Sequence, residues 1–263
     1  MTEERKYRQP PIAEVIFVVN FTRDSSWDNT YPGLLSKELA NILPEKSSLA
    51  GFELEMGGTG GQPEFRPSLS DIVVFTNHER NIRVEPFKHQ LVIRHTKPYT
   101  HWENFRVIIE KVLQSYYRIS EGSTTQSLQL IYVNKVDFPA GTPGAPKVIS
   151  INDYFQLEDS FKWLPKETER LGFISGVLIR PSSVKVLSFK PNDGDQLSIE
   201  VRAPAGALVA IFLQNSYFNP RINLKTAEEI LMWADQAHSV LNWAFESLVT
   251  DKLRETFGEI KDA

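Results

Sequence analysis

The sequence predicts an α+β fold: two packed halves, each a mainly antiparallel sheet covered by a helix, with a long helix at the C-terminus. Several short segments alternate apolar and polar residues and end at Gly, Pro or Asn, a pattern typical of strands in a meander. Two longer segments repeat their apolar residues every three to four positions, which indicates amphipathic helices. Hydrophobic residues make up 41% of the 263 residues and aromatic residues 11%, enough to bury a sizeable core.

The first half, residues 1–138, begins with a strand at 11–21 that is rich in Val, Ile and Phe. A helix follows, with leucines at helical spacing from Leu34, and Pro44 closes it because proline clashes with the preceding turn. The next strands are expected at 51–56, 71–78, 81–86 and 89–97, the order of an antiparallel meander.

An amphipathic helix over 101–117 and a strand over 127–139 complete this half. The helix carries one apolar stripe, formed by Trp102, Phe105, Ile108, Ile109, Val112 and Tyr116. Residues 139–147 are rich in Pro and Gly, which continue neither a helix nor a strand, so we interpret them as a linker.

The second half, residues 148–263, repeats the plan of strands followed by a helix. Strands are expected at 173–181, 184–191, 196–204 and 207–218, with a hairpin turn at 192–194. One uninterrupted helix is predicted from about Lys225 to Phe257, with a capping box at Thr226 and a stop at Gly258. Leu253 and Phe257 are expected to dock against the first half or a second subunit rather than face water.

The run Gly57-Gly58-Thr59-Gly60-Gly61 invites comparison with a phosphate-binding loop or a nucleophile elbow. Both of those motifs require a helix directly after the glycines. Pro63 and Pro67 oppose a helix here, so the run is interpreted as a connector between strands.

Histidine and carboxylate clusters give no sign of a metal or cofactor site. His89 and His95 fall on one strand about 20 Å apart at ~3.3 Å per residue, too far to share an ion. They and the neighbouring His78 and His101 are interpreted as surface or strand-edge residues. Asp195 sits in a turn-like segment and is interpreted as a solvated loop residue. No metal, cofactor or catalytic residue is predicted.

Composition excludes several classes of protein. The chain has no cysteine, which removes disulfides, thiolate metal ligands and cysteine nucleophiles. The charged N-terminus lacks an apolar signal segment, and no apolar run approaches the ~20 residues that span a bilayer. We therefore expect a cytoplasmic protein without membrane contact. A net charge of −4 gives no general attraction to nucleic acid.

Two groups of residues are candidates for binding. The first is the basic segment 80–97, where cationic side chains near aromatic residues are suited to nucleic acid; the alternative is the charged, exposed face of a sheet. Its candidates are Arg80, Arg83, Lys88 and Arg94. The second group would meet a ligand or partner, with polar members in a pocket between sheet and helix or, alternatively, at a solvated strand end. Its candidates are Lys97, Tyr99, Trp102, Glu103, Tyr132, Asn134 and Lys135.

The chain resembles a sporadically distributed family of uncharacterised prokaryotic proteins of about this length, which open with a Pro-Pro-Ile-x-Glu strand. The motifs that carry the resemblance cover nearly the whole chain: Pro10-Pro11-Ile12-Ala13-Glu14, Lys97-Pro98-Tyr99-x-x-Trp102-Glu103-x-Phe105, Tyr132-Val133-Asn134-Lys135, Asp153-Tyr154-Phe155 and Asp251-Lys252-Leu253-Arg254-x-x-Phe257-Gly258. The departures are Thr100-His101 in place of a Pro-Gly-like turn and Lys135 in place of Arg. The resemblance implies no activity and no site residues.

The favoured hypothesis is a non-enzymatic interaction or accessory protein of a prokaryotic defence, antitoxin-like or mobile-element module. It rests on the lack of any catalytic signature and on the scattered distribution of the family, and it implies a protein partner or a homo-oligomer. The alternatives are a nucleic-acid-binding protein that uses segment 80–97, and a small-ligand binder or unrecognised enzyme with a pocket between sheet and helix.

Overall fold

The computed structural model describes residues 5–22, 30–57, 64–99, 101–120, 123–137, 154–156, 176–180, 184–189, 194–202 and 210–260. The strands are β1 (Lys6–Tyr7), β2 (Ile12–Phe21), β3 (Glu45–Gly57), β4 (Glu64–Asn77), β5 (Ile82–Pro86), β6 (Gln90–Thr96), β7 (Thr125–Asp137), β8 (Gly176–Arg180), β9 (Val184–Phe189), β10 (Gln196–Arg202), β11 (Ala210–Asn219) and β12 (Glu259–Ile260). The helices are α1 (Tyr31–Leu39), α2 (Trp102–Ile119), α4 (Ala227–Leu248) and α5 (Asp251–Phe257). The α+β class is confirmed.

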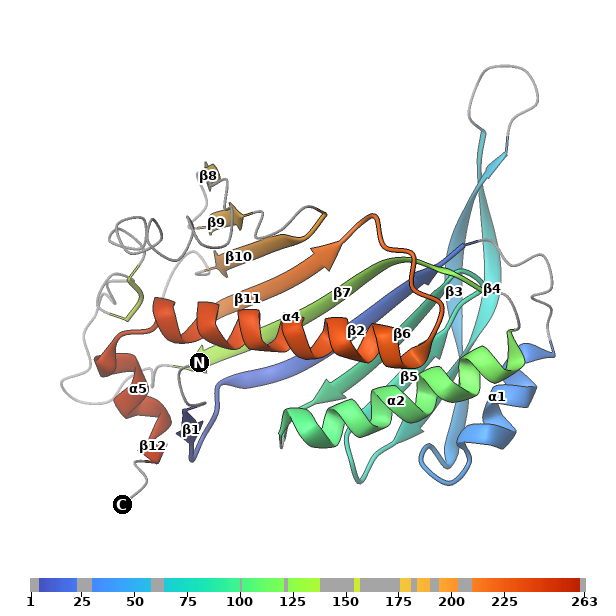
Figure 1. Ribbon diagram of the computed structural model, residues 1–263, viewed down its shortest axis with the longest axis horizontal. Helices are drawn as coiled ribbons and strands as arrows, with labels where there is room; N and C mark the ends of the chain where they lie inside the picture. The colour runs from blue at the N-terminus through green and yellow to red at the C-terminus, as the bar shows by residue number, and fades with distance from the viewer. Residues whose placement is uncertain are drawn as a thin grey trace.

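Ten strands form one antiparallel sheet in the order β3-β4-β5-β6-β2-β7-β11-β10-β9-β8 (Figure 1). Two separate sheets are not confirmed, because β7 of the first half pairs directly with β11 of the second half. This pairing satisfies backbone groups that two isolated sheets would leave unpaired at their edges. The predicted boundaries at 138 and 148 stay a prediction, and the linker 139–147 lies outside the described residues.

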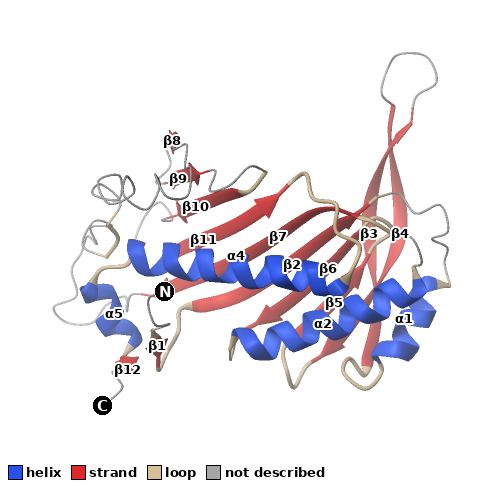
Figure 2. Ribbon diagram, viewed as in Figure 1, coloured by secondary structure: helices blue, strands red, loops and turns tan. Residues whose placement is uncertain are grey.

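Helices α1, α2 and α4 lie on the same face of the sheet (Figure 2). Alternate residues of the central strand β2, among them Val15, Phe17 and Val19, are fully buried beneath these helices, as strand geometry dictates. In α2, Phe105 and Ile109 of the predicted stripe are also fully buried. Each such side chain stabilises the fold by roughly 1.5–3 kcal/mol. The core therefore lies between one sheet face and one helix layer.

The predicted C-terminal helix is wrong in one respect, because it breaks after Leu248 into α4 and α5. The segment Tyr154–Gln156 runs beside the break: the Gln156 N–H donates to the Leu248 carbonyl, and the Thr250 N–H donates to the Tyr154 carbonyl. These bonds occupy groups that a continuous helix would pair internally. The Thr250 hydroxyl then caps α5 by accepting from the Leu253 N–H.

Both predicted ends of the C-terminal region are confirmed. Thr226 and Glu229 form the reciprocal capping box at the start of α4. Gly258 follows α5 with a left-handed φ of 66°, a conformation that favours glycine. Leu253 and Phe257 are buried within the hydrophobic core of the chain itself.

Asp195 is buried, which corrects its interpretation as a solvated loop residue. Its carboxylate accepts hydrogen bonds from the Tyr217 hydroxyl at 2.8 Å, the Asn219 amide at 2.7 Å and the Trp233 indole at 3.4 Å. Such bonds offset the cost of burying a charge. Asp195 therefore ties the start of β10 to β11 and α4.

No helix in the described part of the chain is long and apolar enough to cross a membrane. The compartment of the protein stays a prediction.

Candidate functional site

A cavity of about 730 Å³ opens between the sheet, α2, α4 and the two ends of the chain. Its size falls in the range of about 300–1,000 Å³ that is typical of small-molecule sites. Residues from β1, β2, β7, β12, α2 and α4 and the segments beside them line it: Arg5, Tyr7, Arg8, Pro10, Pro11, Ile12, Tyr99, His101, Trp102, Glu103, Tyr132, Asn134, His238, Leu241, Asn242, Phe245, Glu246 and Ile260.

A β-bulge at the start of β2 shapes the floor of the cavity. Simple alternation from Val15 would place Ile12 on the face of the sheet away from the helices. The register between β2 and β7 shifts between Ile12 and Glu14, so Ile12 lies opposite Asn134. Opposed residues of an antiparallel pair share a face, and the bulge therefore turns Ile12 toward the cavity.

One end of the cavity is a cluster of hydrogen-bonded aromatic side chains. The Tyr132 hydroxyl lies 2.8 Å from Nδ1 of His238 and 3.4 Å from the Tyr99 hydroxyl. The His238 ring stacks on Trp102 at 4.7 Å between centroids, with the planes 8° apart. The cluster offers flat apolar surface together with a few polar atoms, the composition that recognises aromatic ligands.

Asp235, which is not part of the cavity lining, holds Trp102 in position. Its carboxylate accepts from the Trp102 indole at 2.9 Å and from Nε of Arg106 at 2.9 Å. Trp102 is thus fixed on both its ring face and its N–H. Rings positioned in this way lose little conformational entropy when a ligand binds.

Burial lowers the pKa of His238 to about 4, and the nearby carboxylates of Glu103 and Asp235 oppose this shift. The imidazole is therefore neutral near pH 7. A neutral imidazole can form a hydrogen bond with the Tyr132 hydroxyl without the cost of burying a charge.

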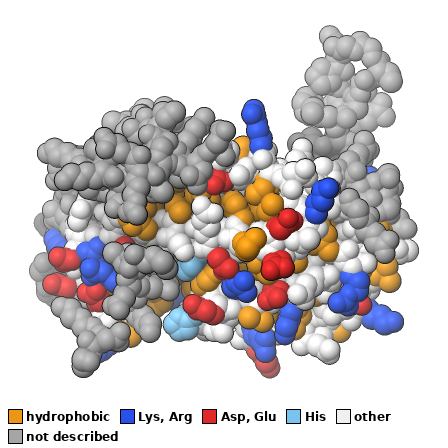
Figure 3. Space-filling view, viewed as in Figure 1, with side chains coloured by type: hydrophobic (Ala, Val, Ile, Leu, Met, Phe, Trp, Pro, Cys, Tyr) orange, Lys and Arg blue, Asp and Glu red, His pale blue; other side chains and the backbone are white. Residues whose placement is uncertain are grey.

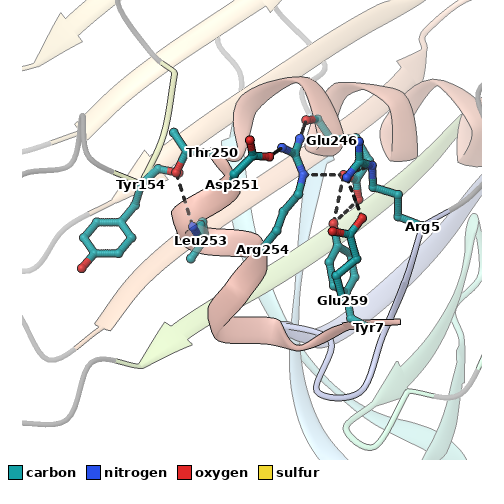
Figure 4. A network of polar contacts seen from close by, with 9 residues as sticks. All are labelled: Arg5, Tyr7, Tyr154, Glu246, Thr250, Asp251, Leu253, Arg254 and Glu259. Carbon is teal, nitrogen blue, oxygen red and sulfur yellow. Dashed lines mark hydrogen bonds and ion pairs between the residues drawn. The ribbon is translucent and has the colours of Figure 1, made fainter. Parts of the chain in front are cut away.

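The opposite end of the cavity is lined by the two-stranded sheet of β1 and β12, which pair through only two residue pairs. We call this sheet the clasp, because it joins the two ends of the chain. A two-stranded sheet is marginal by itself, so side chains have to hold it. The Tyr7 hydroxyl donates to Glu246 at 2.8 Å, and Arg254 reaches the same carboxylate at 3.3 Å (Figure 4). Arg5 pairs with Glu259 at 2.6 Å. Burial and the neighbouring Glu246 charge raise the pKa of Tyr7, which keeps its hydroxyl a donor.

The structure brings together five of the seven residues predicted for the pocket. Tyr99, Trp102, Glu103, Tyr132 and Asn134 all line the cavity. Asn134 is 2% exposed, so it does not sit at a solvated strand end.

The other two candidates, Lys97 and Lys135, are exposed and do not belong to the cavity lining. The Lys135 side chain pairs with Asp137 at 3.1 Å.

The basic candidates of segment 80–97 are divided in the structure. Arg83 pairs with Glu85 at 2.5 Å, and Arg94 pairs with Glu14 at 3.1 Å. Arg80 lies in the turn before β5 and Lys88 in the turn after it, at opposite ends of that strand. Two of the four charges are thus paired with carboxylates, and β5, which separates the other two, is about 17 Å long at ~3.3 Å per residue.

His95 corrects part of the histidine interpretation, because it is 5% exposed. Alternation in β6 places His95 on the face of the sheet that the helices cover. There its ring centroid lies 4.9 Å from that of Tyr99 and 5.6 Å from that of Phe105. Among the described residues, no group of three or more His, Asp or Glu is arranged to hold a metal ion.

Sequence reasoning missed the lining residues contributed by the chain ends and α4, namely Arg5, Tyr7, Arg8, His238, Asn242 and Glu246. The signal available in α4 was polar residues at His238, Asn242 and Glu246, four apart and therefore on one face of the helix.

No protein-family model matches this chain, and a search of curated proteins found no significant relative.

Proposed function

We propose that this protein binds a small ligand with an apolar, aromatic body in the cavity between the sheet and α4. The observation that carries the proposal is that Tyr7, Trp102, Tyr132 and His238, which are far apart in the sequence, line one cavity of about 730 Å³. Enclosed apolar surface with a few oriented polar groups is the usual composition of a ligand site.

The lining also contains polar atoms that could orient a ligand. The Tyr132–His238 pair is the best placed polar group, with its atoms 2.8 Å apart. Such a pair orients a ligand by donating or accepting a hydrogen bond. The proposal assigns these residues to ligand positioning and assigns no reaction.

The test is a ligand-observed NMR screen of neutral aromatic fragments against the wild type and two variants. Asn242→Trp places a large ring at a lining position, and we expect it to abolish the binding of hits. Met232→Trp adds the same ring at an exposed position of the same helix and should leave binding unchanged. Hits that bind both variants equally, or an absence of hits for the wild type, would refute the proposal.

A second candidate is the interaction or accessory protein of a defence, antitoxin-like or mobile-element module. Figure 3 shows hydrophobic side chains exposed between charged ones on the helix face. Val107 of α2 and Met232 of α4 are large apolar residues with exposed fractions of 45% and 61%. A contiguous apolar patch on this face would suit a protein partner or a homo-oligomer, and these two residues are its candidates.

This second candidate is tested by co-purification from the native host with wild-type protein and a Val107→Asp, Met232→Asp variant. A stoichiometric partner, or a second copy of the chain, that the variant loses would support an interface on the helix face. A monomeric wild type with no partner would contradict it. Membership of the uncharacterised prokaryotic family that the sequence resembles is likewise a proposal.

A further inference from the structure

We infer that the ligand is an elongated amphipathic anion, with a planar ring at the aromatic end of the cavity and an anionic group at the clasp. This inference rests on the proposed ligand-binding function and names the chemistry of the ligand.

The cavity is elongated along α4. His238, Asn242 and Glu246 all line it and follow one face of the helix. Eight residues separate the first from the last, which is about 12 Å at 1.5 Å per residue. His238 marks the aromatic end, where it stacks on Trp102, and Glu246 marks the clasp, where it accepts from Tyr7. A ligand that contacts both ends must therefore be long rather than compact.

Most charges at the clasp are already paired with each other. Glu246 accepts hydrogen bonds from Tyr7 and Arg254, and Arg254 also donates to Asp251 at 2.6 Å. Arg5 pairs with Glu259. These groups form a wall at the clasp. Each charged group among them is paired with a neighbouring group of opposite charge, so none of them requires a counter-ion from a ligand.

Arg8 is the exception in this wall. Arg8 lines the cavity, and among the described residues no carboxylate forms an ion pair with its guanidinium. Its backbone is held in place, because the Arg8 N–H donates to the Gly258 carbonyl at 3.1 Å. A guanidinium that none of the described carboxylates pairs with is suited to a carboxylate, sulfonate or phosphate, which it can bind through two parallel hydrogen bonds.

The charged groups at the aromatic end set the orientation of the ligand. Glu103 is exposed at the start of α2 and lines the cavity beside His101 and the neutral His238. A negative charge there repels an anionic group, whereas Arg8 attracts it. The ring therefore lies against Trp102 and the anionic group lies at Arg8.

The experiment uses three probes that share one body: 4-(naphthalen-1-yl)butanoate, its primary amide and 4-(naphthalen-1-yl)butylammonium. Their affinities are measured by isothermal titration calorimetry at low salt. We expect the anion to bind roughly tenfold more tightly than the amide, the effect of one charge-assisted hydrogen-bonded pair. The cation should bind no more tightly than the amide.

Arg8→Gln should reduce the affinity for the anion to that for the amide and leave the affinity for the amide unchanged. Arg80→Gln removes another exposed arginine, which is not part of the cavity lining, and serves as the matched control. Equal affinities for anion and amide, a tighter cation, or an unchanged Arg8→Gln variant would overturn the ligand class and leave the pocket proposal standing. If none of the three probes binds and the fragment screen also yields no hit, the proposed function itself fails.

Discussion

Acidification should destabilise the protein through His238. Its ring is enclosed by Trp102 and Tyr132, and burial lowers its pKa from 6.5 to about 4. Glu103 and Asp235 favour the charged ring, but their effect is smaller than the effect of burial. Between these two pKa values the unfolded chain therefore binds a proton at His238 that the folded chain does not.

The sign and size of the effect follow from linkage. Stability rises with pH wherever the unfolded state binds more protons, so the contribution of His238 is fully present above about pH 6.5. It is lost as the pH falls toward about 4 and does not change further below that value. At about 1.4 kcal/mol for each pKa unit, the loss between about pH 7.5 and about pH 4.5 is about 2 to 3 kcal/mol.

Urea unfolding of the wild type and of His238→Gln at both pH values isolates this contribution. The free energy of unfolding of the wild type should fall by about 2 to 3 kcal/mol more than that of the variant. An NMR titration of the His238 ring gives the midpoint directly and should place it near pH 4. A midpoint near 6.5, or equal pH dependence of the two proteins, would show that burial does not lower the pKa of His238.

Three further predictions concern the C-terminal region and the clasp. Leu253→Ser with Phe257→Ser should cost several kcal/mol, roughly 2–5 for each buried side chain, and an unchanged melting temperature would show that these residues are not packed. Thr226→Ala should lower the free energy of unfolding by about 1 kcal/mol because it removes the capping box, whereas Thr226→Ser should restore most of it. Tyr7→Phe should cost roughly 1.5–3 kcal/mol in urea unfolding because the half-buried Glu246 loses a donor, and a variant as stable as the wild type would show that this bond does not hold the clasp.

Much of the fold could be predicted because it is encoded locally. The Val-, Ile- and Phe-rich segment 11–21 predicts β2, and the stripe of α2 predicts a helix that buries Phe105 and Ile109. The pairing partner of a strand is not encoded locally. Whether β7 is an edge strand or pairs with β11 depends on backbone hydrogen bonds between residues about eighty positions apart. The break between α4 and α5 is likewise made by the distant segment Tyr154–Gln156, although Thr250 offered a local N-cap signal.

The candidate site could be predicted in part for the same reason. Polar or aromatic residues inside apolar elements, such as Tyr132 and Asn134 in β7, stand out in the sequence and do line the cavity. Arg8 and His238 do not stand out, because an arginine near a chain end and a histidine in an amphipathic helix are ordinary in sequence. Their importance depends on the pairing of β1 with β12, which brings the two ends of the chain together.

The most direct test is a crystal structure of the protein grown with 4-(naphthalen-1-yl)butanoate. We predict one molecule in the cavity, with its ring against Trp102 and its carboxylate within hydrogen-bonding distance of the Arg8 guanidinium. A cavity that stays empty at a saturating concentration of the probe, or a probe bound only elsewhere on the surface, would contradict this prediction.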